Sequence, residues 1–196
     1  MSRQLLFTKV NILDVVRMQE KKIAEAANRY MLRDLEGDNY ATVVKKLHEE
    51  FEFPKLTVDF ESKKVDSVSG TTRLSRHDAF LRGMREGATV DCDMARFRVP
   101  FEGDVQLFEI QPSTYWSNSA YADIEGRELW FQYPMLNADA VKEQFARDRE
   151  LVMKYVDQIN RDADKFNQGL GGLIETALGQ RKQALDAKDK FLEELR

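Results

Sequence analysis

The last sixty residues of the chain, from Asn137 to Arg196, contain no proline and keep an almost unbroken helical rhythm. Their apolar side chains recur mostly at steps of three, four and seven residues, which is typical of one face of a helix. Charged residues fill the other faces, so the stretch resembles a solvated helix with an apolar seam that favours packing on a partner helix. The residues predicted to form this interaction seam are Phe145, Val152, Tyr155, Ile159, Phe166, Leu170 and Leu173.

Glycines interrupt this stretch at Gly169, Gly171 and Gly172. Each costs a helix about 1 kcal/mol relative to alanine. The chain could fold back here as an antiparallel helical hairpin, or the glycines could let another backbone approach closely. Because the apolar phase continues across the gap, a continuous kinked helix is a third possibility. The sequence also stops in mid-helix without a cap signal, so we expect a fragment of a longer protein.

Helical and strand patterns are segregated before residue 137, which favours an α+β fold. We predict an α+β domain over residues 1–136, with a small antiparallel sheet, and a long helical hairpin or coiled coil over 137–196. A serine- and threonine-rich stretch over 61–72 is expected to be a loop. The other predicted elements are helices from residue 11 to about 35 and over 40–50, strands over 55–60, 89–99 (with a bulge or bend) and 105–110, a short helix over about 75–85, and a hairpin over 121–133.

Composition excludes several classes of function. A formal charge of −4 makes nucleic acid possible as a partner but not favoured. Cys92 is the only cysteine, and His48 and His77 lie far apart, so we predict no disulfide, metal constellation or cofactor. No apolar run approaches the roughly 20 residues of a membrane span, and the N-terminus is not a secretory signal. We therefore expect a cytoplasmic protein with no membrane partner.

Acidic residues on two predicted strands suggest an enzymatic alternative. Restriction-type nucleases hold a divalent metal between carboxylates on neighbouring strands, and carboxylate oxygens suit Mg²⁺. Asp91, Asp104 and Glu109 are the candidate catalytic residues, with Asp93 beside them, although Gln111 stands where such sites usually have lysine. Simple alternation along a strand would equally place these acids on a solvent-facing surface.

A basic group precedes these strands at Arg73, Arg76, Arg82 and Arg85. Arginine forks suit phosphate, and a helix beginning near Ser75 could add backbone amide donors. We consider these four arginines a candidate site for a phosphate-bearing ligand. The alternative interpretation is a solvated face that pairs with the many acidic side chains.

Three segments resemble a region of bacterial multidomain proteins associated with anti-phage defence and restriction. They are the strand–turn–strand over 98–108, the Pro112-Ser113-Thr114 turn, and the helix over 165–170 that leads to Gln180-Arg181-Lys182. The resemblance covers about residues 85–196. It implies a non-catalytic module that oligomerises, senses or docks, while a separate effector supplies any catalysis. We therefore expect a non-enzymatic interaction module that self-associates or binds an effector through its C-terminal helices, and a metal-dependent nuclease is the alternative.

Overall fold

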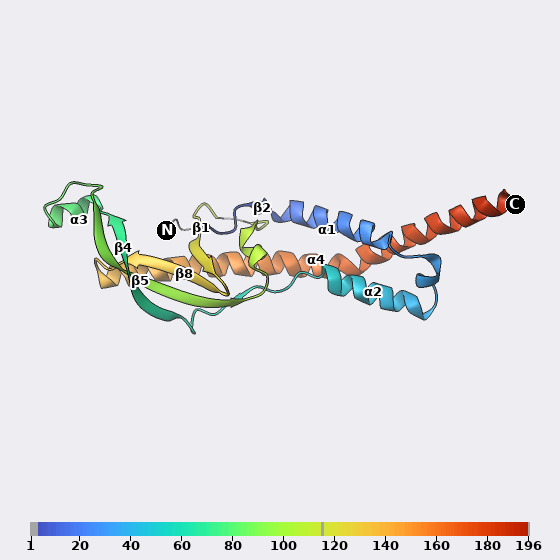
Figure 1. Ribbon diagram of the computed structural model, residues 1–196, viewed down its shortest axis with the longest axis horizontal. Coiled ribbons are helices and arrows are strands. Elements are labelled where there is room, and N and C mark those ends of the chain that lie inside the picture. The colour runs from blue at the N-terminus through green and yellow to red at the C-terminus, as the bar shows by residue number, and fades with distance from the viewer. Residues whose placement is uncertain (1–3, 115, 196) are drawn as a thin grey trace.

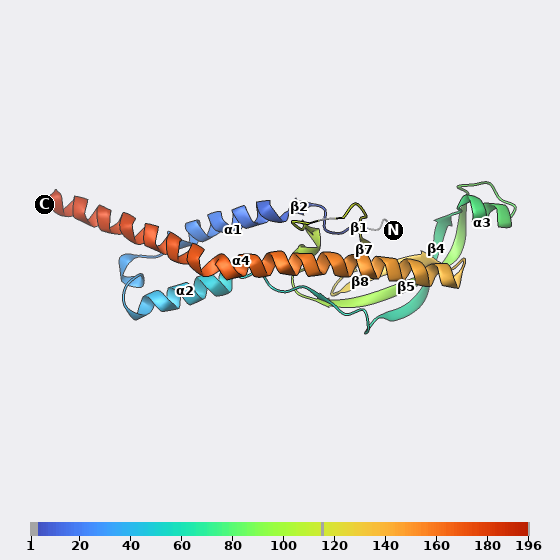
Figure 2. The same cartoon turned by 180° about the vertical axis from the view of Figure 1, so that it is seen from behind.

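The computed structural model describes residues 4–114 and 116–195. The molecule is elongated, with a curled antiparallel sheet towards one end and a group of helices towards the other (Figure 1). One long helix, α4, runs along both parts, and the view from behind shows it crossing the sheet and then passing between α1 and α2 (Figure 2). The predicted α+β fold is confirmed.

Helix α4 spans Ala138–Glu194 as one element of 57 residues, about 85 Å at 1.5 Å per residue. Asn137 caps it, because its side-chain oxygen accepts hydrogen bonds from the amides of Asp139 and Ala140 at 2.9 and 3.1 Å. Because α4 is one uninterrupted helix, the helical hairpin alternative is wrong and the continuous helix is correct. No helix in the described part of the chain is long and apolar enough to cross a membrane.

The three glycines lie inside α4, and none of them serves a close backbone approach. A Cβ atom added at Gly169, Gly171 or Gly172 would meet nothing within 4 Å. The helix nevertheless changes direction before its C-terminal part (Figures 1 and 2). Thr176 follows the glycines and donates its hydroxyl to the carbonyl of Gly172 at 2.7 Å, a contact known to bend helices.

The main sheet is organised around β5, Thr89–Glu102. Its strand order is β1-β7-β8-β5-β3, and β4 pairs with β5 on the same edge as β3, all antiparallel. A separate parallel pair joins β2 to β6. The other strands are β1 Gln4–Leu5, β2 Val10–Asn11, β3 Thr57–Val58, β4 Lys64–Arg73, β6 Ile110–Gln111, β7 Tyr121–Glu125 and β8 Glu128–Pro134.

Strand β4 corrects the prediction of a loop over 61–72. Ten consecutive residues of β4 pair with β5, from Lys64 opposite Arg98 to Arg73 opposite Thr89. The predicted bulge in β5 is likewise absent from this register. The pairing of β5 with β8 stops at Met94, so the β4–β5 hairpin extends about 16 Å past it as a two-stranded arm. One face of β4 is half-buried and the other is exposed. Because the residues on both faces are mostly polar, the sequence lacks the alternation of apolar and polar residues by which a strand is recognised.

Two other predicted elements change their nature or length. Residues 105–110, predicted as a strand, form the 3₁₀ helix η2, Val105–Glu109, with Asp104 as its cap. The predicted 121–133 hairpin is confirmed, and Gly126 adopts a positive φ of 59° in its turn. The short helix α3 is capped by Ser75 as predicted but covers only Arg76–Leu81.

Helices α1, Ile12–Ala27, and α2, Asp38–Phe51, flank the second half of α4. The predicted start of α1 is confirmed, and Asn11 caps it, because its side chain accepts a hydrogen bond from the amide of Leu13. A short 3₁₀ turn, η1 Leu32–Asp34, lies in the connection between the two helices. This connection is tied to α4 by Arg181, whose Nε donates to the carbonyl of Tyr30 at 3.1 Å.

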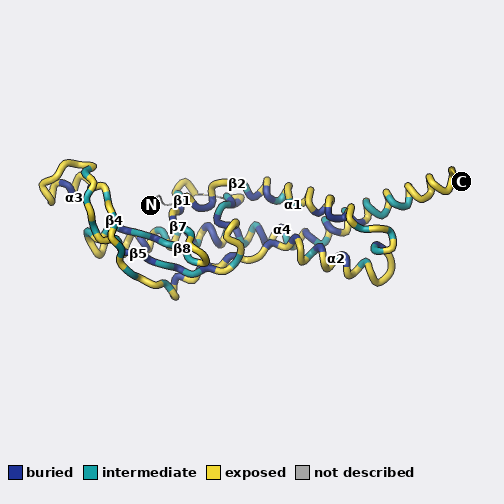
Figure 3. The backbone as a smooth tube through the Cα atoms, viewed as in Figure 1, coloured by how far each residue is buried: buried dark blue, intermediate teal, exposed yellow. Residues whose placement is uncertain are grey.

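The apolar seam of α4 lies in the interior of the protein. One hydrophobic core runs along the molecule and includes side chains from the sheet, α1, α2 and α4 (Figure 3). No polar or charged residue in the described part of the chain is fully buried. Of the seven predicted seam residues, Leu173 is half-buried and the other six are buried, namely Phe145, Val152, Tyr155, Ile159, Phe166 and Leu170.

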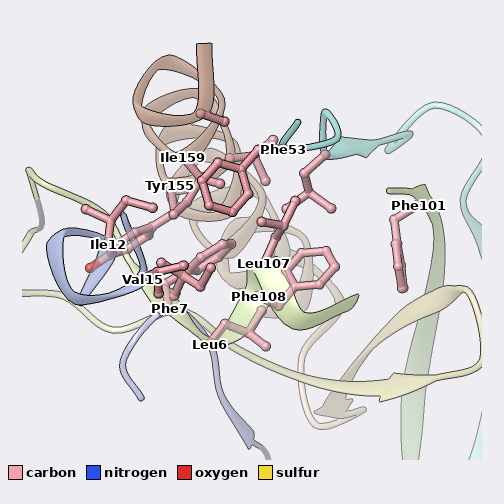
Figure 4. Close-up of a cluster of buried hydrophobic side chains, with 14 of the residues drawn as sticks. Leu6, Phe7, Ile12, Val15, Phe53, Phe101, Leu107, Phe108, Tyr155 and Ile159 are labelled. Carbon is pink, nitrogen blue, oxygen red and sulfur yellow. The ribbon is translucent and has the colours of Figure 1, made fainter. Parts of the chain in front are cut away.

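This burial corrects the assignment of the seam to a partner. Phe145 packs against the sheet and stacks on Phe97, with ring centroids 4.1 Å apart. Tyr155 stacks on Phe7 at 5.0 Å and lies beside Ile159 in the same cluster (Figure 4). Ile159 and Leu170 are completely buried. Helical periodicity shows which face is apolar, but the chain's own elements cover that face here.

Two asparagines on α4 hold the connector between α2 and β3. Asn167 accepts a hydrogen bond from the amide of Phe53 at 2.9 Å and donates to its carbonyl at 3.0 Å. Asn160, two helical turns earlier, makes the same pair of bonds with Leu56 at 2.9 and 2.8 Å. Each side-chain amide thus satisfies both backbone groups of one residue, as a neighbouring β-strand would.

We predict that Asn160→Ala and Asn167→Ala each lower the free energy of unfolding by about 1–3 kcal/mol. Each substitution leaves a partly buried backbone amide and carbonyl without their partner. Urea denaturation followed by circular dichroism measures the change. Gln168→Ala is the control, because Gln168 is exposed on the same helix. Equal stability of the control and the two asparagine variants would contradict this role.

Candidate interaction surfaces

The first candidate surface is the tip of the β4–β5 hairpin, residues 73–88, which extends beyond the rest of the sheet (Figure 1). Leu74 and Ala79 are buried inside it. Backbone bonds close its base, since the amide of Leu74 donates to the carbonyl of Ala88 and the amide of Gly87 donates to the carbonyl of Leu74. The tip is therefore a folded unit with a small interior of its own.

The four arginines predicted as a phosphate site all lie on this tip. Arg73 ends β4, Arg76 begins α3, and Arg82 and Arg85 follow it. All four are exposed, and none forms an ion pair within the described residues. The tip contains only two carboxylates, Asp78 and Glu86, against four arginines, so it is positive on a protein whose formal charge is −4.

One of the backbone amides expected to assist phosphate binding, that of Asp78, is already engaged. The hydroxyl of Ser75 accepts a hydrogen bond from the amide of Asp78 at 3.2 Å and donates to its carboxylate at 2.5 Å. A carboxylate thus lies at the start of α3, where it repels an anion. This geometry opposes the helix-terminus part of the phosphate hypothesis, although the arginines are indeed brought to one tip.

The sequence prediction missed the apolar part of the tip. Phe80 is 82% exposed, Leu81 is 68% exposed and Met84 is 45% exposed. A predicted helix of about ten residues would have buried one face, but α3 has only six residues and buries only Ala79. The signal available in the sequence was the length of the polar stretch before Ser75, which carries the tip away from the core.

Arg96 and Arg98, which follow in the sequence, belong to a different surface. Both reach Asp66 across the β4–β5 pair, with Nε–carboxylate distances of 2.7 Å for Arg96 and 3.3 Å for Arg98. The Arg96 guanidinium also lies over the ring of Trp130 at 4.6 Å. Its hydrogen bonds hold the pKa of Asp66 below the usual value of an aspartate. These arginines are neutralised within the sheet.

The predicted nuclease carboxylates do not come together. Asp91 lies near the start of β5 and Asp104 follows its end, so the strand separates them by roughly 35 Å. Asp104 caps η2, and Glu109 forms an ion pair with Lys9 at 2.6 Å. No group of three potential metal ligands occurs in residues 4–114 and 116–195. The structure therefore does not form the acidic site predicted from Asp91, Asp104 and Glu109, because Asp91 lies near the far end of β5 and the predicted strand over 105–110 is the 3₁₀ helix η2.

The second candidate surface is formed by α1 and the later part of α4. A groove of about 440 Å³ lies between the two helices. Beyond it, α4 extends past α1 and α2, and exposed residues predominate there (Figure 3). The exposed apolar side chains of this extension are Phe191, Leu192 and Leu195. The apolar residues that line the groove are Ile12, Leu13, Val16, Phe166, Gly169 and Leu173.

No protein-family model, curated protein or solved structure matches this chain. The two candidate surfaces are therefore interpreted from their own chemistry.

We predict that Phe80→Ser changes the free energy of unfolding by no more than about 0.5 kcal/mol, because the ring contributes little to the core. Phe97→Ala is the control for a buried ring and should cost about 3–5 kcal/mol. Calorimetric melting of the two variants measures the difference. A large loss for Phe80→Ser would show that this ring stabilises the fold and is not free for a partner.

Proposed function

We propose that this protein is a non-enzymatic interaction module that docks an acidic partner protein through its hairpin tip. The observation that supports this most directly is the exposure of Phe80 and Leu81 among four arginines without ion-pair partners. Aromatic residues, methionine and arginine are enriched at protein interfaces, and arginine is frequent among their energetic hot spots. The partner would offer an apolar hollow for Phe80 with carboxylates around it.

The composition of the tip favours protein over nucleic acid. Leu81 and Met84 cannot stack on bases, and they bring no charge to a phosphate backbone. The arginines alone would suit phosphate, but the remaining surface of the protein is acidic and would repel a long polyanion. The arginines are better explained as the polar rim around an apolar contact, where they steer association with an acidic surface.

The resemblance of residues 85–196 to defence-associated proteins suggests the setting. We propose that the module acts in the cytoplasm of a bacterium, within an anti-phage assembly whose chemistry belongs to a separate effector. Asp91, Asp104 and Glu109 lie apart from one another, and metal-assisted cleavage needs ligands within a few ångströms of one another. Their separation supports a docking role better than a nuclease role.

The docking proposal can be tested with a photo-crosslinking amino acid at position 80 in cells that contain the protein. The matched control carries the same amino acid at Glu143, which is exposed on α4. We expect a protein adduct at position 80 that is absent at position 143. The adduct protein, identified and purified, should then bind the unlabelled module.

Calorimetric titration of that purified protein gives the decisive measurement. We expect Phe80→Ser to weaken binding by about 2 kcal/mol or more, as at an interfacial hot spot. The R76E/R82E variant should also weaken binding, and wild-type affinity should fall with added salt. Unchanged affinity in both variants would contradict the proposal. Crosslinks at position 80 to nucleic acid, lost in R76E/R82E, would instead favour the nucleic-acid alternative.

A further inference from the structure

The exposed end of α4 and the α1–α4 groove lie on one face of the same helix. The successive spacings of Gly169, Leu173, Ala184, Ala187 and Phe191 are 4, 11, 3 and 4 residues. Each spacing is close to a whole number of helical turns, so the side chains share a stripe. The first two line the groove, and the last three are exposed beyond it. The stripe runs beside the buried seam and shares the half-buried Leu173 with it, whereas its other four residues are exposed.

The stripe is complementary to itself when two α4 helices lie antiparallel. A two-fold axis beside Gln180 would place Phe191 of one copy opposite Gly169 of the other, since each lies eleven residues from Gln180. Gly169 lines the groove and presents no side chain, and a Cβ atom added there would meet nothing within 4 Å, so the position is open to the ring of a second copy. The same axis places the small Ala187 opposite the larger Leu173.

The charges along the two edges agree with this register. On the edge formed by α1, Lys188 of one copy comes beside Glu20 of the other. On the opposite edge, Glu194 comes beside Lys165. None of these four residues forms an ion pair within the described part of the chain, so all four are free to pair between copies.

We infer that two copies of this chain form an antiparallel dimer in which the C-terminal end of each α4 occupies the α1–α4 groove of the other. The contact extends over about thirty residues of α4, roughly 45 Å, and the side of α1 that lines the groove lies next to it. That length is compatible with an interface of about 1,200 Å², the lower end of the range for stable complexes. The inference goes beyond the proposed function and does not depend on the hairpin tip.

Light scattering across a concentration series tests the dimer on the full chain. We expect a mass approaching twice 22.8 kDa at high concentration. Gly169→Leu should give a monomer, because the leucine side chain would occupy the part of the groove that the ring of Phe191 needs. Gly171→Leu is the matched control, since it makes the same change on the opposite side of the helix and should remain dimeric. Both variants should fold at least as well as wild type, because leucine favours helix over glycine.

Charge reversal tests the register separately. E20K and K188E should each weaken dimerisation roughly tenfold through like-charge contacts, and the E20K/K188E double variant should recover most of the loss. A wild-type monomer throughout the series would overturn the inference. So would a dimer that persists in Gly169→Leu, or single charge variants that dimerise as well as wild type. None of these results bears on binding at the tip.

Discussion

Burial of the apolar seam on α4 is the constraint on which the rest of the structure depends. Three parts of the chain cover the seam in succession along the helix. The sheet packs on Phe145, the N-terminal segment packs on Tyr155 through Phe7, and α1 and α2 enclose the stretch that contains Leu170. Each large aliphatic side chain buried in this way contributes about 1.5–3 kcal/mol, and the asparagine bonds from α4 hold the connector between the covering parts in place.

A long helix covered along its middle explains where the free surfaces lie. The β4–β5 hairpin extends beyond the sheet at one end, and α4 extends beyond α1 and α2 at the other (Figure 1). The large apolar side chains of the seam are buried along the covered part of α4, whereas Phe80 at one end of the molecule and Phe191 at the other are exposed. The two ends differ in chemistry, because the tip combines apolar groups with unpaired arginines and the helix end has charges of both signs. We therefore assign them different occupants, an acidic partner and a second copy.

Sequence patterns predicted the elements whose signals are local. The helix that begins at residue 11, the short helix that begins near Ser75 and the hairpin over 121–133 were predicted from a few neighbouring residues each, and all three are present. Strand β4 was missed because its half-buried face carries Asp66, Gly70 and Thr72 with Val68 as its one apolar residue, so the sequence shows no alternation of apolar and polar residues. The clustering of the arginines could be predicted from their spacing. The exposure of Phe80 was missed, because it depends on how far the arm carries α3 from the core, and the polar stretch before Ser75 was the signal for it. The seam was recognised as apolar, yet periodicity does not reveal what covers it.

Hydrogen–deuterium exchange along α4 tests most directly whether the apolar seam is buried within a single copy. At concentrations low enough to keep the protein monomeric, we expect strong protection from Phe145 to Leu178 and rapid exchange from Gln183 to Leu195, where side chains are largely exposed. Uniformly rapid exchange along α4 under these conditions would mean that the seam is covered only by a partner protein. That result would contradict the intramolecular core and return the seam to the role of an assembly surface.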